Sequence, residues 1–168
     1  MRNYMTIKPL SYLNNLRFHR AITSTIVVVL TIISLATKQL FYNNNHFDVS
    51  WIVPSFNEGI SYSISVNIVL VIFVSVICLL WLIRMYDKWR IHSLILIMIM
   101  SGGMSNLIDR VFYGWVRDYL YLWHSLPFLN FVFNLADVML VIGGVLLIYH
   151  YHQVDILHQD PDSDDNLV

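Results

Sequence analysis

The sequence predicts an all-α membrane protein in which four transmembrane helices form a single domain over residues 1–168. Of its residues 57% are hydrophobic and only 12% are charged, which is too apolar for a soluble domain of this length. Four apolar runs stand out, each close to the roughly 20 residues that a helix needs to cross a bilayer. The predicted spans are residues 21–40, 64–83, 91–108 and 132–149.

The segments between the spans differ in character. In residues 41–63 the three asparagines at positions 43–45 mark a turn, and the alternation of Val49, Trp51 and Val53 then indicates short extended pieces. Residues 84–90 form a tight basic loop, and residues 109–131 form a second polar stretch. The tail, residues 150–168, carries five aspartates and no Lys or Arg, so we expect it to be disordered.

The basic residues predict the orientation. Of the ten Lys and Arg residues, four lie before the first span and three lie in the 84–90 loop. Because basic loops stay on the cytoplasmic side, both termini are expected in the cytoplasm and the two polar stretches on the outer side.

Three aspartates, Asp109, Asp118 and Asp137, lie at or near the ends of apolar segments. A carboxylate beside hydrocarbon costs a few kcal/mol, so such residues indicate a functional site. Two neighbouring aspartates can share one proton, so that one activates a water and the other protonates a leaving amine. Asn134 lies one helical turn before Asp137 and can orient its carboxylate.

Other interpretations remain open at this stage. Asp109, next to Arg110 and three residues after Asn106, is interpreted as part of a structural cluster. For Lys38 the plainer interpretation is a side chain that extends to the lipid headgroups, and the alternative is an inward side chain that pairs with a carboxylate. All three aspartates could also belong to a charge network that only caps helices.

Several classes of function find no support. The histidines are scattered and do not form a recognised ligand motif, so no metal and no cofactor is predicted. No serine has a base in a recognisable arrangement. A net charge of −1 gives no reason to expect nucleic acid as a partner.

Four short motifs then occur in order: Asn57-Glu-Gly59; Gly102-Gly103 followed by Asn106-Leu-Ile-Asp109-Arg110; Val116-Arg117-Asp118-Tyr119; and Phe133-Asn134-Leu-Ala136-Asp137. With this order, spacing and topology the sequence resembles the bacterial lipoprotein signal peptidases, also called signal peptidase II. The resemblance covers nearly the whole chain except its two ends.

The resemblance implies a multi-pass enzyme of the bacterial inner membrane, with a small extracytoplasmic β-platform and a short periplasmic amphipathic segment. It implies an aspartic endopeptidase that removes signal peptides from diacylglyceryl-modified prolipoproteins, before the lipidated cysteine, and that globomycin-type peptides inhibit. Asp118 and Asp137 would be the catalytic pair. The residues that would shape and support the site are Asn57, Gly59, Asn106, Asp109, Arg110, Asn134, Ala136 and Lys38.

Two departures from the family pattern stand out. Ser34 and Leu35 occupy the positions of an acid and an amide about one turn before Lys38, which leaves this lysine without the acidic partner. Arg117 occupies a position that is commonly apolar, and it would lower the pKa of Asp118 if it points inward. A divergent paralogue that binds lipidated peptides without cleaving them is therefore one alternative function. A small carboxylate-based carrier is another, but a relay predicts carboxylates at several depths, and this chain has them near one surface.

Overall fold

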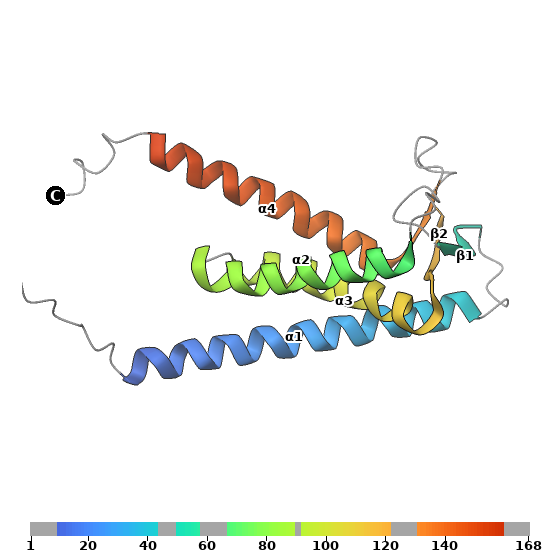
Figure 1. Ribbon diagram of the computed structural model, residues 1–168, viewed down its shortest axis with the longest axis horizontal. Coiled ribbons are helices and arrows are strands. Elements are labelled where there is room, and N and C mark those ends of the chain that lie inside the picture. Colours follow the sequence, from blue (N-terminus) through green and yellow to red (C-terminus); the bar gives the residue numbers. More distant parts are fainter. Residues whose placement is uncertain (1–9, 44–49, 58–66, 90–91, 122–130, 160–168) are drawn as a thin grey trace, which may run out of the picture.

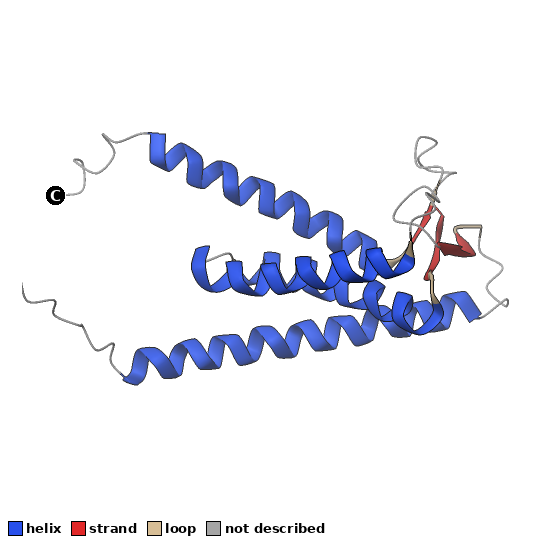
Figure 2. Cartoon of the chain, viewed as in Figure 1, coloured by secondary structure: helices blue, strands red, loops and turns tan. Residues whose placement is uncertain are grey.

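The computed structural model describes residues 10–43, 50–57, 67–89, 92–121 and 131–159. Within these ranges the chain forms four helices and three short strands, and the strands lie together at one end of the helices (Figures 1 and 2). In chain order the elements are α1 (Leu10–Asn43), β1 (Ile52–Asn57), α2 (Ile68–Trp89), α3 (Ser93–Tyr113), β2 (Val116–Tyr121), β3 (Val132–Phe133) and α4 (Leu135–Gln159).

Helix α3 lies at the centre of the bundle and packs against α1, α2 and α4. The C-terminal ends of α1 and α3 and the N-terminal ends of α2 and α4 lie beside the sheet (Figure 1). At the opposite end α1 and α4 diverge. Helix ends that are far apart in the sequence therefore meet at the sheet, where polar side chains from several elements can converge.

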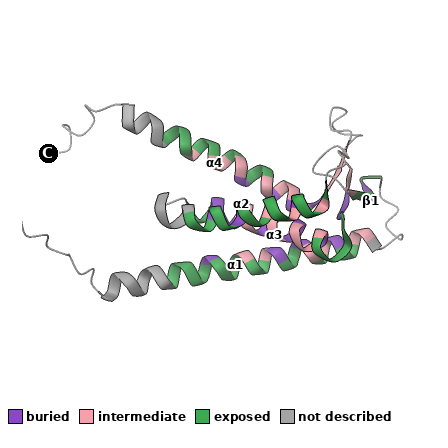
Figure 3. Ribbon diagram, viewed as in Figure 1, coloured by how far each residue is buried: buried purple, intermediate pink, exposed green. Residues whose placement is uncertain are grey.

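Helices α1, α3 and α4 are long and apolar enough to cross a membrane, over Phe18–Tyr42, Ser93–Tyr113 and Leu135–Gln153. The apolar part of α2, Ile68–Arg84, is shorter. At 1.5 Å per residue it is about 25 Å long, near the lower limit of a span. All four helices expose large apolar side chains, as surfaces in contact with lipid do (Figure 3). The predicted helical membrane fold is confirmed.

Helices α1, α2 and α4 extend beyond the expected segments. Helix α1 begins at Leu10, although its membrane-spanning part, Phe18–Tyr42, is close to the predicted span. Helix α2 continues to Trp89, so most of the loop expected at residues 84–90 is helical, and α4 continues to Gln159, so residues 150–159 do not belong to a disordered tail. The segment after Tyr149 contains no Gly or Pro that would end a helix, and the first proline is Pro161. Because a residue before proline is disfavoured in the helical conformation, α4 ends close to this point.

The small sheet expected from the family resemblance is present. It is antiparallel with the strand order β1-β2-β3, and Ser55 pairs with Asp118 while Leu120 pairs with Phe133. The β1–β2 register is irregular between Ile52 and Ser55. The described residues outside the four long helices include no amphipathic helix, and residues 44–49, 58–66 and 122–130 lie outside the description.

A glycine turn connects α3 directly to β2. Gly114 has a φ of 82°, a left-handed conformation that glycine adopts without strain, and its N–H donates to the carbonyl of Arg110 at 3.1 Å. The tight turn carries the chain from the end of α3 back along the site. It thereby brings the β2 residue Arg117 beside Asp109 on α3.

One face of α3 is buried and carries small or polar residues at four-residue spacing. Ser101, Ser105 and Asp109 form one row, and Gly102 and Asn106 form the adjacent row. A Cβ on Gly102 would lie 2.5 Å from the carbonyl oxygen of Ala136 on α4. The first turn of α4 therefore approaches α3 closely because residue 102 has no side chain.

We expect Gly102→Ala to destabilise the protein, because the added methyl would push α4 away from α3 next to Asp137. Overpacking of this kind costs about 1–3 kcal/mol. The matched control is Gly144→Ala, since a Cβ at that position of α4 meets nothing within 4 Å. Melting temperatures in detergent test the pair, and equal stability of the two variants would contradict the close α3–α4 contact.

Candidate active site

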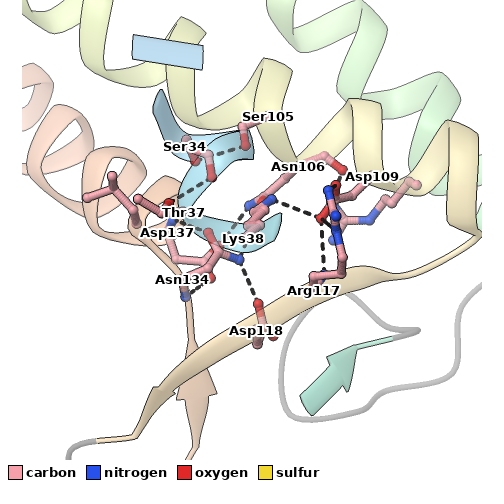
Figure 4. Close-up of polar contacts among 12 residues, drawn as sticks. Ser34, Thr37, Lys38, Ser105, Asn106, Asp109, Arg117, Asp118, Asn134 and Asp137 are labelled. Atoms are coloured by element: carbon pink, nitrogen blue, oxygen red, sulfur yellow. Dashed lines mark hydrogen bonds and ion pairs between the residues drawn. The ribbon is translucent and has the colours of Figure 1, made fainter. Parts of the chain in front are cut away.

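Ionisable side chains from four elements converge beside the sheet (Figure 4). Helix α1 contributes Lys38, α3 contributes Asp109, β2 contributes Asp118 and α4 contributes Asp137. Asp109 and Lys38 are fully buried and Asp118 is 2% exposed. The three carboxylates, which the sequence predicts near one surface, belong to one network of polar contacts.

Asp137 is held by a reciprocal cap at the start of α4. The Asn134 side-chain oxygen accepts from the Asp137 N–H at 3.2 Å, and Asp137 Oδ2 accepts from the Asn134 N–H at 3.0 Å. This is the geometry of a capping box, in which the residue before the helix and the third helical residue bond each other. The helix N-terminus also favours a negative charge at this position. The Asn-x-x-Asp spacing thus positions a carboxylate as well as starting a helix.

Asp118 lies on the central strand of the sheet. Burial, and after it the charge of Asp137, raise the pKa of Asp118 from 3.8 to about 7. Hydrogen bonds from the side chains of Asn134 and Asn57 act in the opposite direction but are outweighed. A carboxyl group in this environment is partly neutral near pH 7.

Asn134 connects the two carboxylates of the candidate pair. Its side-chain Nδ2 donates to Asp118 Oδ1 at 2.6 Å, while its backbone N–H donates to Asp137. One buried residue therefore sets the positions of both aspartates. From the sequence Asn134 was expected to orient Asp137 only, and its contact with Asp118 depends on how β2 packs against the start of α4.

Lys38 requires a correction. Its side chain does not extend to the headgroups: it is fully buried, its Nζ donates to Asn106 Oδ1 at 2.7 Å, and it forms a 3.1 Å ion pair with Asp109. Asp109 on α3 thus supplies a counterion although residue 34 is not acidic. Ser34 instead shares a 2.9 Å hydrogen bond with Ser105 across the α1–α3 interface.

Arg117, the other departure from the family pattern, does not point toward Asp118. Its guanidinium faces Asp109, with an ion pair of 2.7 Å, and it also donates to Gln39 of α1 at 2.9 Å. It stacks over the ring of Tyr113, 4.5 Å from the centroid. Arg117 therefore does not act as a cation beside Asp118, and the pKa of Asp118 is raised.

Asp109 belongs to a structural cluster, as expected, but with other partners. From the sequence its expected partners were Arg110 and Asn106. Its carboxylate instead accepts from the backbone and side chain of Arg117 and from Lys38. The Arg110 guanidinium donates to the backbone carbonyl of Asn106 at 3.4 Å. One carboxylate thus joins α1, α3 and β2.

An open groove of about 640 Å³ leads to the site. Apolar residues of α2, α3 and α4 line most of it, including Leu70, Val74 and Leu140. Its polar lining comprises Asn57, Ser75, Asn106, Arg110 and Asp137. An apolar cleft that ends at a carboxylate can accept a lipophilic chain and present a polar bond to that carboxylate.

Tyr119 and Thr37 also hold the site together, and neither was predicted as a site residue from the sequence. The Tyr119 hydroxyl donates to Thr37 Oγ1 at 2.9 Å and accepts from the Leu135 N–H at 3.4 Å. Tyr119 thereby ties β2 to α1 and to the start of α4. The sequence could have indicated this role for Tyr119. It directly follows the predicted catalytic Asp118, and a buried tyrosine usually needs a hydrogen-bond partner for its hydroxyl.

The remaining predicted residues are placed as follows. Asn57 ends β1 and contacts Asp118, and Ala136 is fully buried against α3. Gly59 lies outside the described residues. In the described part of the chain no group of three potential ligands is suited to a metal ion.

Several known proteins are similar to this chain in sequence. A family model described as signal peptidase (SPase) II matches residues 21–153. The lipoprotein signal peptidase of Streptococcus thermophilus (strain CNRZ 1066) is 40% identical over 100 residues, which are 55% of this chain and 61% of that relative. The match therefore spans less than two thirds of that relative's length. The lipoprotein signal peptidase of Wigglesworthia glossinidia brevipalpis is 34% identical over 147 residues, covering 76% of this chain and 92% of that relative.

Solved structures agree on the fold. Two bacterial membrane enzymes determined by the in meso method superpose with TM-scores of 0.68 and 0.66, at 22% and 23% identity. They cover 88% and 78% of this chain, and 94% and 92% of their own chains. The helices, the sheet and the family model that matches most of the sequence lead to one conclusion: this chain belongs to the signal peptidase II family.

Proposed function

We propose that this protein is an aspartic endopeptidase of the membrane that removes signal peptides from diacylglyceryl-modified prolipoproteins, cleaving before the lipidated cysteine. One observation carries the proposal: Asn134 joins two carboxylates, Asp118 and Asp137, and Asp137 lies at the polar end of an apolar groove. Membership of the signal peptidase II family supports the substrate class.

The departure at Ser34 suggested a non-catalytic relative, but it leaves the proposed catalytic pair, Asp118 and Asp137, unchanged. Lys38 keeps a carboxylate partner in Asp109, and neither catalytic aspartate is replaced. The carrier alternative predicts carboxylates along a path through the membrane. The three aspartates of the site, Asp109, Asp118 and Asp137, instead gather at the sheet end of the helices.

In the proposed reaction Asp118 starts protonated and Asp137 starts ionised. Asp137 takes a proton from a water while the water oxygen bonds to the scissile carbonyl carbon, and Asp118 donates a hydrogen bond to the carbonyl oxygen. When the tetrahedral intermediate collapses, the C–N bond breaks and the leaving amine receives a proton from the pair. One water is consumed, one peptide bond is broken, and the pair again carries one proton.

The groove suits the two apolar parts of such a substrate. Its walls from α2 and α4 can hold acyl chains or the apolar part of a signal peptide, because both remain in contact with lipid. Arg110 and Asn57 at its polar end can bind the peptide backbone near the scissile bond. Globomycin-type peptides would occupy the same groove and compete with substrate.

The basic residues support an orientation in the bacterial inner membrane with both termini in the cytoplasm. The sheet and the aspartate pair then face the outer side, where lipoproteins are processed. Reporter fusions at Asn44 and Asp160 test this orientation. We expect them to report opposite sides, and the same side for both would contradict it.

The function is tested with purified protein in detergent or nanodiscs. We expect cleavage of a peptide that spans a signal-peptide C-terminus and carries a diacylglyceryl-modified cysteine. The matched control is the same peptide with an unmodified cysteine, which should be cleaved much more slowly. If neither peptide is cleaved, or if both are cleaved equally, the proposed substrate class is wrong.

Stability should also depend on pH through Asp118. Asp118 has a pKa of about 7 in the folded state and 3.8 in the unfolded chain, so its contribution to the free energy of unfolding is fully present below pH 3.8. That contribution is lost as the pH rises to 7, at about 1.4 kcal/mol per pH unit. The Asp118→Asn variant should lack this dependence. Melting temperatures of both proteins from pH 4 to 8 measure it, and parallel curves would contradict a raised pKa.

A further inference from the structure

The side-chain amide of Asn106 lies between a cation and a carboxylate. Its Nδ2 donates to Asp137 Oδ1 at 2.7 Å, and its Oδ1 accepts from Lys38 Nζ at 2.7 Å. An amide can rotate by 180° and exchange its oxygen and nitrogen. The orientation of Asn106 therefore decides whether Asp137 meets a donor or an acceptor.

Lys38 permits only one of the two orientations. An ammonium group has three donors and no acceptor, so a rotated amide would place its N–H₂ against Lys38 and its oxygen against the Asp137 carboxylate. Both contacts would be repulsive, and buried polar groups without partners are costly. The ion pair with Asp109 keeps the ammonium in place, and Asn134 Nδ2 adds a weaker 3.4 Å contact to the Asn106 oxygen.

We propose that Lys38 is a positioning residue for the cleavage reaction, because it orients the Asn106 amide so that a donor always faces Asp137. With that donor in place the amide hydrogen-bonds to the carboxylate form of Asp137, the form that takes the proton from water. Without it, the amide can rotate and present its oxygen, which can hydrogen-bond only to the carboxylic acid form. This inference rests on the proposed function and assigns Lys38 a role in it that goes beyond its ion pair.

Other charges also act on Asp137, so the effect of the amide must be separated from theirs. Asp118 faces it from β2, Arg110 from α3 and Lys38 itself from α1, each close enough for electrostatic interaction. Removing Lys38 thus removes a positive charge as well as an amide partner. A double-mutant cycle with Asn106 separates the two effects.

The cycle compares pH profiles of kcat/KM for wild type, Lys38→Met, Asn106→Ala and the double variant on the diacylated peptide. We expect Lys38→Met to move the acidic limb to higher pH and to lower kcat/KM at pH 7 by about 10- to 100-fold, as for a lost hydrogen bond to a charged group. Asn106→Ala should have a similar effect, and the double variant should resemble Asn106→Ala. If Lys38→Met lowers kcat/KM by the same factor in the Asn106→Ala background as in wild type, Lys38 acts through its charge alone, and the proposal is wrong.

Ser34→Ala is the matched control, because it removes another buried hydrogen bond of α1 without touching Asn106. Its acidic limb should not move. If Lys38→Met does not fold, Lys38→Met/Asp109→Asn removes both members of the buried pair and takes its place. An inactive wild type would refute the proposed function, whereas an active wild type with an unchanged acidic limb in the Lys38 variant would refute only the positioning role.

Discussion

Asp118→Asn and Asp137→Asn should each reduce cleavage of the diacylglyceryl-modified signal-peptide substrate by about ten-thousand-fold or more. An amide can neither accept the proton of the attacking water nor act as a carboxylic acid toward the leaving amine. Both variants should remain inserted and folded, because Asn keeps the shape of Asp. Turnover of purified variants, alongside melting temperatures in detergent, measures the effect.

The double variant should be no worse than either single variant, because groups that act as a unit are not additive. Ser55→Ala is a suitable control: residue 55 pairs with Asp118 across the sheet and has no proposed role in the reaction. Its turnover should stay close to that of wild type. Substantial turnover in either aspartate variant would contradict the aspartic mechanism.

Asp109→Asn should destabilise the protein by about 3–5 kcal/mol, the range for breaking a buried ion pair from one side. Lys38 and Arg117 both pair with this carboxylate, and Asp109 and Lys38 are fully buried. The substitution leaves two cations without their counterion. Thermal unfolding in detergent at neutral pH measures the loss.

A double-mutant cycle separates the energy of the Asp109–Arg117 ion pair from the other effects of losing either side chain. Arg117→Gln alone should destabilise, but Arg117→Gln together with Asp109→Asn should cost less than the sum of the two. The exposed Thr25→Ala of α1 is the control and should be nearly neutral. Strict additivity of the two substitutions would contradict a direct Asp109–Arg117 interaction.

Much of the fold follows from the sequence because the relevant signals are local. Apolar runs of membrane-spanning length predict the helices, and the Asn134-x-x-Asp137 spacing predicts a carboxylate fixed at a helix start. The basic residues and the three aspartates predict a polar site at one end of the bundle. That Asp118 and Asp137 both contact Asn134 is consistent with these signals and with the family resemblance.

The partners of Lys38 and Arg117 were harder to predict. Which face of α1 turns inward depends on its packing against α3. The buried polar residues Thr31, Ser34 and Lys38 lie three and four residues apart and mark that face, but polar residues also occur on the exposed sides of α1, so the sequence alone did not single it out. For Arg117 a signal existed: successive residues of a strand point to opposite faces, so Arg117 and Asp118 cannot both face the candidate pair. That rule requires β2 to be recognised as a strand, and residues 116–121 show no clear alternation of apolar and polar residues.

The central claim is tested most directly by the masses of the cleavage products. One diacylglyceryl-modified signal-peptide substrate is incubated with wild type and with the Asp118→Asn/Asp137→Asn double variant. We predict that wild type yields two products, a signal peptide that ends one residue before the lipidated cysteine and a lipopeptide that begins with it. The double variant should yield neither. Cleavage at another bond, or the same products from the double variant, would contradict the assignment of Asp118 and Asp137 as the catalytic pair.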